Sequence, residues 1–172
     1  KTSKKIMTVV NTFAAAVEGS GASEVDAFAT AFGSVTSVLT AKIAASAVLD
    51  FDVAADIALV TTQLSADISK VENANKAVFD GMATLEASIA NVVSIIDNVT
   101  DIEDTADAFQ TIGLLTDQVK VAAAAESGNL TNEGAYKGQD ADGIAKSAAV
   151  TAAAPALVIN GDLASLGSVT NS

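Results

Sequence analysis

The chain contains no cysteine, histidine, tryptophan or arginine, and it has only one proline and one tyrosine. Without cysteine it can form neither a disulfide nor a thiolate nucleophile, and without histidine it lacks the commonest general base. A Ser/His/Asp triad and zinc sites built on His or Cys are therefore excluded. The nucleotide-binding patterns G-x-x-x-x-G-K-[S/T] and G-x-G-x-x-G do not occur either. Paired carboxylates are the one catalytic arrangement left, but acids more commonly cap or solvate helices. We therefore expect a protein that is not an enzyme and needs no cofactor.

The charge is strongly negative, because 21 acidic residues stand against nine basic ones, all lysine, for a net charge of −12. Such a surface repels nucleic acid and anionic membranes, so we expect neither as a partner. No run of 18 apolar residues is present, and we expect no membrane-spanning helix. Three lysines, Lys1, Lys4 and Lys5, begin the chain and precede an apolar stretch to Val17. We interpret this segment as the first helix of a processed chain.

A regular apolar pattern occupies the middle of the chain and predicts one long helix from Asp52 to about Val99. The steps are three or four residues throughout, which is the period of an α-helix with one apolar seam. The seam consists of Ile57, Val60, Leu64, Ile68, Val71, Asn75, Val78, Met82, Leu85, Ile89, Val92, Ile96 and Val99. Asn75 falls at an a position of the heptad, where a buried Asn fixes register and partner number. The alternative is a polar residue at the edge of the helix.

Three further helices are expected around this long helix, as in a bundle. The first spans residues 4–18, and the second begins at its cap Ser23 and ends before the Asp50–Asp52 step, where Asp52 caps the long helix. Thr100 and Glu103 form a capping box that predicts a fourth helix over 101–126. The expected apolar face of the second helix is formed by Val25, Phe28, Phe32, Val35, Leu39, Ile43 and Val48. The inward residues of the fourth are Ile102, Phe109, Ile112, Leu115 and Val119.

The last part of the chain differs in character. Residues 127–143 are polar and rich in Gly and Asn, which predicts a long loop. Residues 144–154 are expected to form a short helix, and residues 156–160 and 163–169 two short strands around a turn. Two strands alone are marginal, so this tail should pack on the bundle or on a neighbouring subunit. The predicted fold is thus mainly α: an elongated bundle of about four helices over 1–126, a loop over 127–143, and a β-prone tail over 144–172.

Two short patterns suggest sites on this fold. Asp140 and Asp142 with Gly143 resemble the middle of an EF-hand loop, but the outer ligand positions fail, which leaves a looser calcium site or a plain turn. Asn98 and Asn129 match the N-glycosylation pattern. An acidic cluster would gather a cation or, more simply, cap a helix; it comprises Asp97, Asp101, Glu103, Asp104 and Asp107.

The composition favours a structural role. A chain rich in Ala, Thr, Val, Ser and Asp, without Cys, Trp, His or Arg, resembles extracellular microbial proteins such as flagellins and adhesin segments in composition alone. We therefore expect an extracellular or cell-surface protein that assembles with itself as a filament, surface-layer or adhesin-type subunit. The alternatives are a helical bundle that binds a lipid or other apolar ligand, and one domain of a larger adhesin. The expected assembly contacts are Asn75, the basic start Lys1, Lys4 and Lys5, and the apolar tail residues Leu157, Val158 and Ile159.

Overall fold

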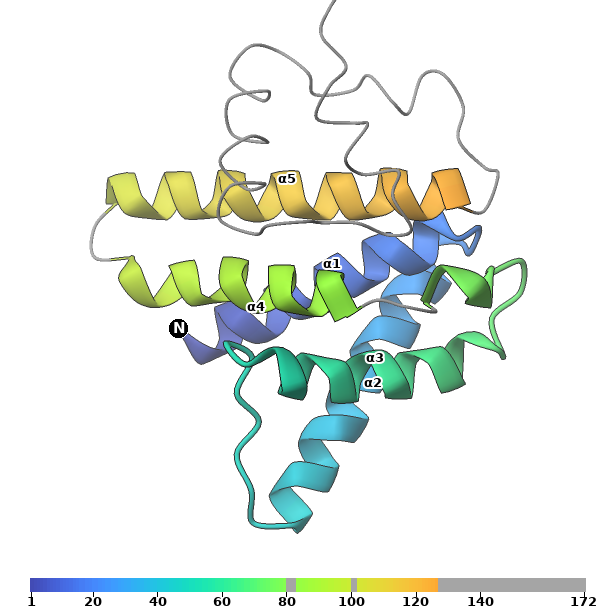
Figure 1. Cartoon of the computed structure of the whole chain (residues 1–172), viewed down its shortest axis with the longest axis horizontal. Coiled ribbons are helices and arrows are strands. Elements are labelled where there is room, and N and C mark those ends of the chain that lie inside the picture. Colours follow the sequence, from blue (N-terminus) through green and yellow to red (C-terminus); the bar gives the residue numbers. More distant parts are fainter. Residues whose placement is uncertain (80–82, 100–101, 127–172) are drawn as a thin grey trace, which may run out of the picture.

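The structure, a computed structural model, describes residues 1–79, 83–99 and 102–126. These residues form five α-helices and one 3-10 helix and contain no β-strand, which confirms the mainly α-helical, bundle-like fold (Figure 1). In chain order the elements are α1 (Thr2–Gly19), α2 (Glu24–Ala44), α3 (Ala54–Ile68), η1 (Lys76–Phe79), α4 (Ala83–Asn98) and α5 (Ile102–Glu126). The expected loop over 127–143, and the helix and strands after it, lie outside the described residues.

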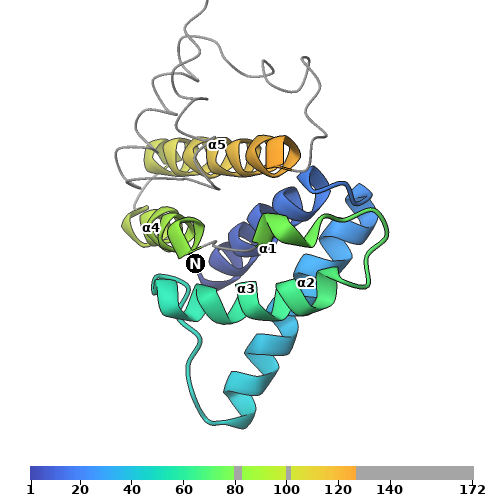
Figure 2. The same cartoon turned by 45° about the vertical axis from the view of Figure 1, so that its right-hand side comes forward.

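The first helix, α1, is the central element of the bundle. It packs most extensively against α5 and α2 and also contacts α4, as the two views show (Figures 1 and 2). Its side chains Val9, Val10, Phe13 and Val17 are fully buried, which agrees with the apolar stretch that the sequence shows up to Val17. Thr12 is buried too, and its Oγ1 atom donates a hydrogen bond to the Thr8 carbonyl oxygen, 2.8 Å away. This local bond satisfies the hydroxyl at a position that water does not reach.

The prediction of one long helix over 52–99 is wrong, because two separate α-helices cover this stretch. The helix α3 ends at Ile68, and a turn, η1 and the undescribed residues 80–82 precede α4. Asn73 lies in this turn with φ of 63°, a left-handed conformation that Asn tolerates better than most residues and that stops an α-helix. The apolar period continues across the break because Ile68, Val78 and Ile89 all reach the same core.

The three helix starts predicted from capping residues differ in outcome, and Thr100 of the third lies outside the described residues. Ser23 caps α2 as expected, since its Oγ atom accepts a hydrogen bond from the backbone N–H of Asp26 at 3.2 Å. Asp52 does not cap α3: the N-cap is Val53, which makes no side-chain bond to the helix. The Asp52 carboxylate instead pairs with Lys5 of α1. At the other break, α5 begins at Ile102, within one residue of the expected position.

The helices α1 and α5 approach closely at Gly19. A Cβ atom on Gly19 would lie 2.2 Å from the Lys120 carbonyl oxygen and 2.9 Å from the Cβ atom of Ala123. Only glycine fits a backbone contact of this kind. The contact places the end of α1 directly against the last part of α5.

The orientation of α2 reverses the prediction for its two faces. The buried stripe consists of small or short side chains: Ala27, Ala31, Ser34, Val35 and Val38. Of the seven residues expected to face inward, only Val35 is fully buried. Small side chains allow α2 to lie close to α1 and α3, and the buried Ser34 hydroxyl donates to Oδ2 of Asp67 on α3 at 3.0 Å. The large apolar side chains are consequently left on the outer face.

Candidate functional site

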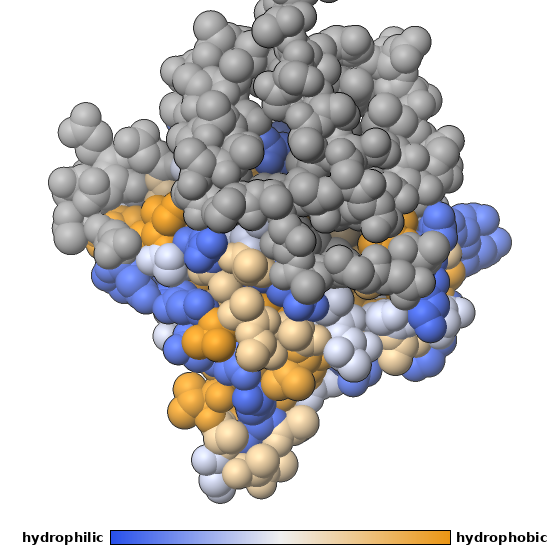
Figure 3. Space-filling model, in the orientation of Figure 1, coloured by the Kyte–Doolittle hydropathy of each residue, from blue (hydrophilic) through white to orange (hydrophobic). Residues whose placement is uncertain are grey.

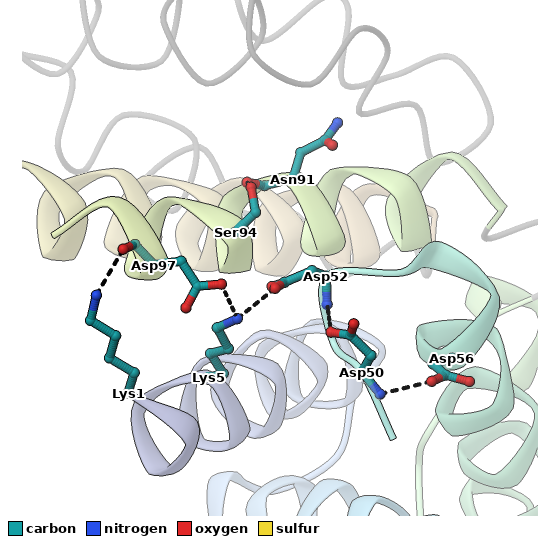
Figure 4. A network of polar contacts seen from close by, with 8 residues as sticks. All are labelled: Lys1, Lys5, Asp50, Asp52, Asp56, Asn91, Ser94 and Asp97. Atoms are coloured by element: carbon teal, nitrogen blue, oxygen red, sulfur yellow. Dashed lines mark hydrogen bonds and ion pairs between the residues drawn. The ribbon is translucent and has the colours of Figure 1, made fainter. Parts of the chain in front are cut away.

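The basic start of the chain is bound within the molecule. The Nζ atom of Lys5 lies 2.5 Å from Oδ2 of Asp52 and 2.5 Å from Oδ2 of Asp97 (Figure 4). Lys1 donates to the Asp97 carbonyl oxygen at 2.8 Å, and the ammonium of Lys4 lies 5.2 Å from the centre of the Phe109 ring. The electropositive end thus meets the electronegative body inside one chain. A contact between copies through the basic start of the chain stays a prediction. Fewer unpaired charges are left to drive it, because these lysines already have partners within the chain.

The contact between Lys5 and Asp97 shifts the pKa of both groups in the direction of mutual stabilisation. Burial alone would lower the pKa of Lys5, but its hydrogen bonds to Asp52 and Asp97 outweigh burial and raise that pKa above its usual value. The hydrogen bond from Lys5 in turn lowers the pKa of Asp97. Within the described residues the Oδ1 atom of Asp52 is buried without a hydrogen-bond partner. The arrangement is a structural ion-pair network that joins α1, the α2–α3 loop and the end of α4.

A second polar network shapes the loop between α2 and α3. The carboxylate of Asp56 accepts from the backbone N–H of Asp50 at 2.7 Å (Figure 4) and from Nζ of Lys42 at 2.7 Å. The first bond, followed by the second, lowers the pKa of the Asp56 carboxyl despite its burial. Lys42 lies in the last turn of α2 and Asp56 in the first turn of α3, so this ion pair connects the two ends of the loop between the helices.

An apolar surface lies on the outer face of α2 and is the feature that the polar networks leave unexplained. Val25, Phe32 and Ile43 are 77%, 47% and 66% exposed, and Phe28 is also exposed. The Phe28 and Phe32 rings are stacked with centroids 6.1 Å apart and an interplanar angle of 16°. On the face shown in Figure 3, hydrophobic side chains gather over the projecting part of the molecule that Figure 1 assigns to α2 and the loop after it. We call the exposed side of α2 the outer face below.

The C-terminal half of α2 extends beyond the other helices (Figures 1 and 2). Ala41, Ile43 and the residues from Ala44 to Val48 are all exposed. By length and composition alone α2 meets the requirement for a membrane-spanning helix, which differs from the expectation that no such helix exists. The apolar composition of α2 is also explained by its place in the bundle, because its stripe of small residues packs on α1 and α3.

A groove of about 670 Å³ adjoins the first turns of the outer face. It lies between α1, α2 and α5, and Val25 and Phe28 form part of its apolar lining. At its rim the Nζ atom of Lys120 lies 2.7 Å from Oε1 of Glu18. Desolvation raises the pKa of the Asp117 carboxyl, against the opposing charge of Lys120, although the side chain lies at the exposed surface. The groove therefore combines an apolar floor with one ion pair.

A smaller pocket of about 190 Å³ lies where α1 begins, α4 ends and α5 begins. Its walls are apolar and two lysines stand at it; the lining residues are Lys1, Lys4, Ile96, Val99, Thr105, Ala108, Phe109 and Ile112. The expectation that Phe109 faces inward is wrong, since this side chain is 53% exposed and lies under Lys4. Leu115 and Val119 of the same helix are fully buried, as expected.

The remaining expected site residues are dispersed. Asn75 follows the turn after α3 rather than sitting in a heptad, and its backbone N–H donates to the Ser20 carbonyl oxygen at 3.0 Å. Asn98 is the last residue of α4. In the part of the chain that the structure describes, no three acidic residues gather to hold a metal ion. The other expected sites lie outside the described residues: Asn129, Asp140, Asp142, Leu157, Val158 and Ile159.

Comparison with known proteins adds no relative to these observations. No family model, no curated protein and no solved structure matches the chain.

Proposed function

We propose that the protein is a non-enzymatic structural subunit, extracellular or at the cell surface, that assembles with copies of itself as a filament, surface-layer or adhesin-type component. The observation that carries this proposal is the outer face of α2, where large apolar side chains stand in solvent while alanine and serine are buried beneath them. A contiguous exposed apolar surface of this kind usually marks an interface.

The physical chemistry of the outer face supports association. Burying apolar surface stabilises a complex by roughly 25 cal/mol per Å², and the exposed side chains of Val25, Phe28, Phe32 and Ile43 offer such surface. Aromatic side chains are enriched where interfaces have their strongest contacts. The chain combines 50% hydrophobic residues with a net charge of −12, which suits a protein whose monomer is soluble and which also self-associates.

Light scattering over a range of protein concentrations, together with electron microscopy, tests the proposal. We expect the mass to rise with concentration and the rise to persist at high salt, because apolar contacts are not screened as charge contacts are. Ordered assemblies in micrographs would support the filament or layer form. A protein that stays monomeric at millimolar concentration contradicts the proposal.

A second candidate function rests on the small pocket beside Lys1 and Lys4. Its apolar walls and two ammonium groups suit a small amphiphilic anion such as a medium-chain carboxylate. A dry cavity of roughly this size can hold a molecule as large as benzene. Calorimetric titration with octanoate tests this binding role. The variant Ile112→Asp, which places charge among the apolar walls, should abolish binding if the pocket is the site, and the absence of heat with the parent protein contradicts it.

A further inference from the structure

The outer face of α2 carries the spacing of a helix-pairing seam. Its residues follow one another in steps of four, three, four, three and four, and they are Val25, Ala29, Phe32, Thr36, Leu39 and Ile43. These steps average 3.6 residues, the period of an α-helix, so the six side chains form one line along α2 that can face a neighbouring helix. The line runs for roughly 28 Å at 1.5 Å per residue. The opposite side of α2 packs on α1 and α3. Within residues 1–79, 83–99 and 102–126 the seam residues are exposed, except for the half-buried Leu39, so a further helix can reach them.

We propose that the seam pairs with α2 of a second copy of the chain, with the two helices antiparallel. This inference rests on the proposed self-assembly and names its contact. The antiparallel arrangement places Phe32 opposite Thr36 and Ala29 opposite Leu39, so that in the central layers of the contact a large side chain faces a small one. Such alternation fills the space between two helices. A parallel pair would instead set Phe32 against Phe32 and Ala29 against Ala29, which crowds one layer and leaves a gap in the other.

The shape of the molecule leaves room for this pairing. The C-terminal half of α2 projects beyond its own bundle (Figures 1 and 2), so it can lie along the body of another copy. There the antiparallel arrangement brings Ile43 of the projecting half to Val25 of the second copy. Val25 stands at the edge of the groove between α1, α2 and α5. Each copy therefore offers both the projecting helix and the place that receives it.

Other occupants fit the seam less well. The seam requires a helix of about 19 residues, and the sequence after Glu126 is interrupted by Pro155, Gly161 and Gly167, which do not support one. An anionic membrane surface is disfavoured by the net charge of −12 and by Glu24 and Asp26 at the start of α2. Lys42, the one basic residue of α2, is paired with Asp56. A second α2 supplies the matching apolar period.

The symmetry of the contact determines how many copies it can join. Two identical faces that pair antiparallel form an isologous contact, which closes at two copies. Such a dimer is the repeating unit from which a filament or layer grows through a second, different contact. One helix face also buries less than the about 800 Å² per partner of a standard interface. We therefore expect a dimer that dissociates on dilution rather than a permanent one.

The first experiment compares two charge substitutions by sedimentation equilibrium. Phe32→Glu places charge in the seam, and Leu59→Glu places it on α3 at a residue of similar exposure, 42% against 47%. We expect Phe32→Glu to weaken dimerisation by about 100-fold and Leu59→Glu to leave it unchanged. Ile43→Glu, at a more exposed seam residue, should act like Phe32→Glu, and circular dichroism checks that all three variants fold. Equal dimerisation of parent and Phe32→Glu, or equal loss in Leu59→Glu, overturns the pairing.

The second experiment reads the orientation of the helices. The chain has no cysteine, so each introduced thiol is unique. A mixture of Val25→Cys and Ile43→Cys chains, treated with a short thiol-specific cross-linker, should give a cross-linked pair of one chain of each kind. Efficient cross-linking of Val25→Cys alone, or none in the mixture, overturns the antiparallel arrangement.

These results also separate the inference from the proposed function. If the protein still assembles after substitutions in the seam, the proposed function stands and the pairing through α2 is wrong. If the parent protein never assembles, both the proposed function and the pairing through α2 are wrong.

Discussion

The ammonium of Lys5 lies 2.5 Å from the carboxylate of Asp97, although the two residues are 92 positions apart in the sequence. The contact joins the beginning of α1 to the end of α4, and Asp52 from the α2–α3 loop binds the same ammonium. Opposite charges from distant parts of the sequence thus neutralise one another within the fold. The stability of the protein should therefore depend on a few contacts of this kind, each of which a single substitution can remove.

Replacing Lys5 by Met should lower the free energy of unfolding by about 1 to 3 kcal/mol, because the carboxylates of Asp52 and Asp97 lose their common partner and Asp52 is largely buried. Urea denaturation at neutral pH measures the loss. Lys1→Met is the matched control: Lys1 donates one exposed bond, so its removal should change the stability by less than about 0.5 kcal/mol. Equal effects of the two substitutions would contradict the role assigned to Lys5.

Replacing Asp56 by Asn should lower the free energy of unfolding at neutral pH by about 1 to 2 kcal/mol, since the charge that binds Lys42 is lost. The folded state lowers the pKa of Asp56 from its ordinary 3.8, so its stabilising contribution exists above that value and disappears as the pH falls through the folded-state pKa. The difference between parent and variant should therefore shrink in urea titrations carried out from pH 7 to strongly acidic pH. A difference that does not depend on pH contradicts this account.

Gly19→Ala should destabilise the protein by about 1 to 3 kcal/mol, because the new methyl group would overlap the Lys120 carbonyl oxygen and push α5 away from α1. Gly113 lies inside α5, and a methyl group added there would have no neighbouring atom within 4 Å. Gly113→Ala should therefore stabilise the protein by about 0.5 to 1 kcal/mol through helix propensity alone. In thermal unfolding, the changes in stability of the two variants should have opposite signs if α1 and α5 approach closely at Gly19. Changes of the same sign would contradict this close approach.

The break after α3 is tested at Asn73. Asn73→Gly should keep or slightly raise the stability, because glycine adopts a φ of 63° without strain, whereas Asn73→Val should lower it by about 1 to 2 kcal/mol. A continuous helix would give the reverse order, since valine favours a helix over glycine. The relative midpoints of urea unfolding decide between the two arrangements.

The sequence predicts the helical class and most helix ends, because capping residues and three-four spacing act locally. Ser23 caps α2, and α1 buries Val9 and Phe13, as their patterns indicate. The break at Asn73 escapes prediction because the apolar residues on both sides contact one core and so keep the spacing of a single helix.

The outer face of α2 escapes prediction for a different reason. Hydrophobicity ranks Phe28 and Phe32 above Ala27 and Ala31, but packing against α1 and α3 selects the side that allows close approach. Helices that are apolar on both sides therefore leave the choice of inner face to tertiary contacts. The signal available in the sequence was the presence of two stripes, one of small residues and one of large residues, on the same segment.

The central position of α1 has a consequence for synthesis. This helix, with Val9 and Phe13 fully buried, packs most extensively against α5, which ends at Glu126. A ribosome that adds 5 to 20 residues per second needs roughly 5 to 20 s to deliver α5 after α1 has emerged. Throughout that interval the nascent chain displays an apolar helix without its main partner, so folding must wait for translation to advance, and the newborn α1 is a natural place for a chaperone to bind.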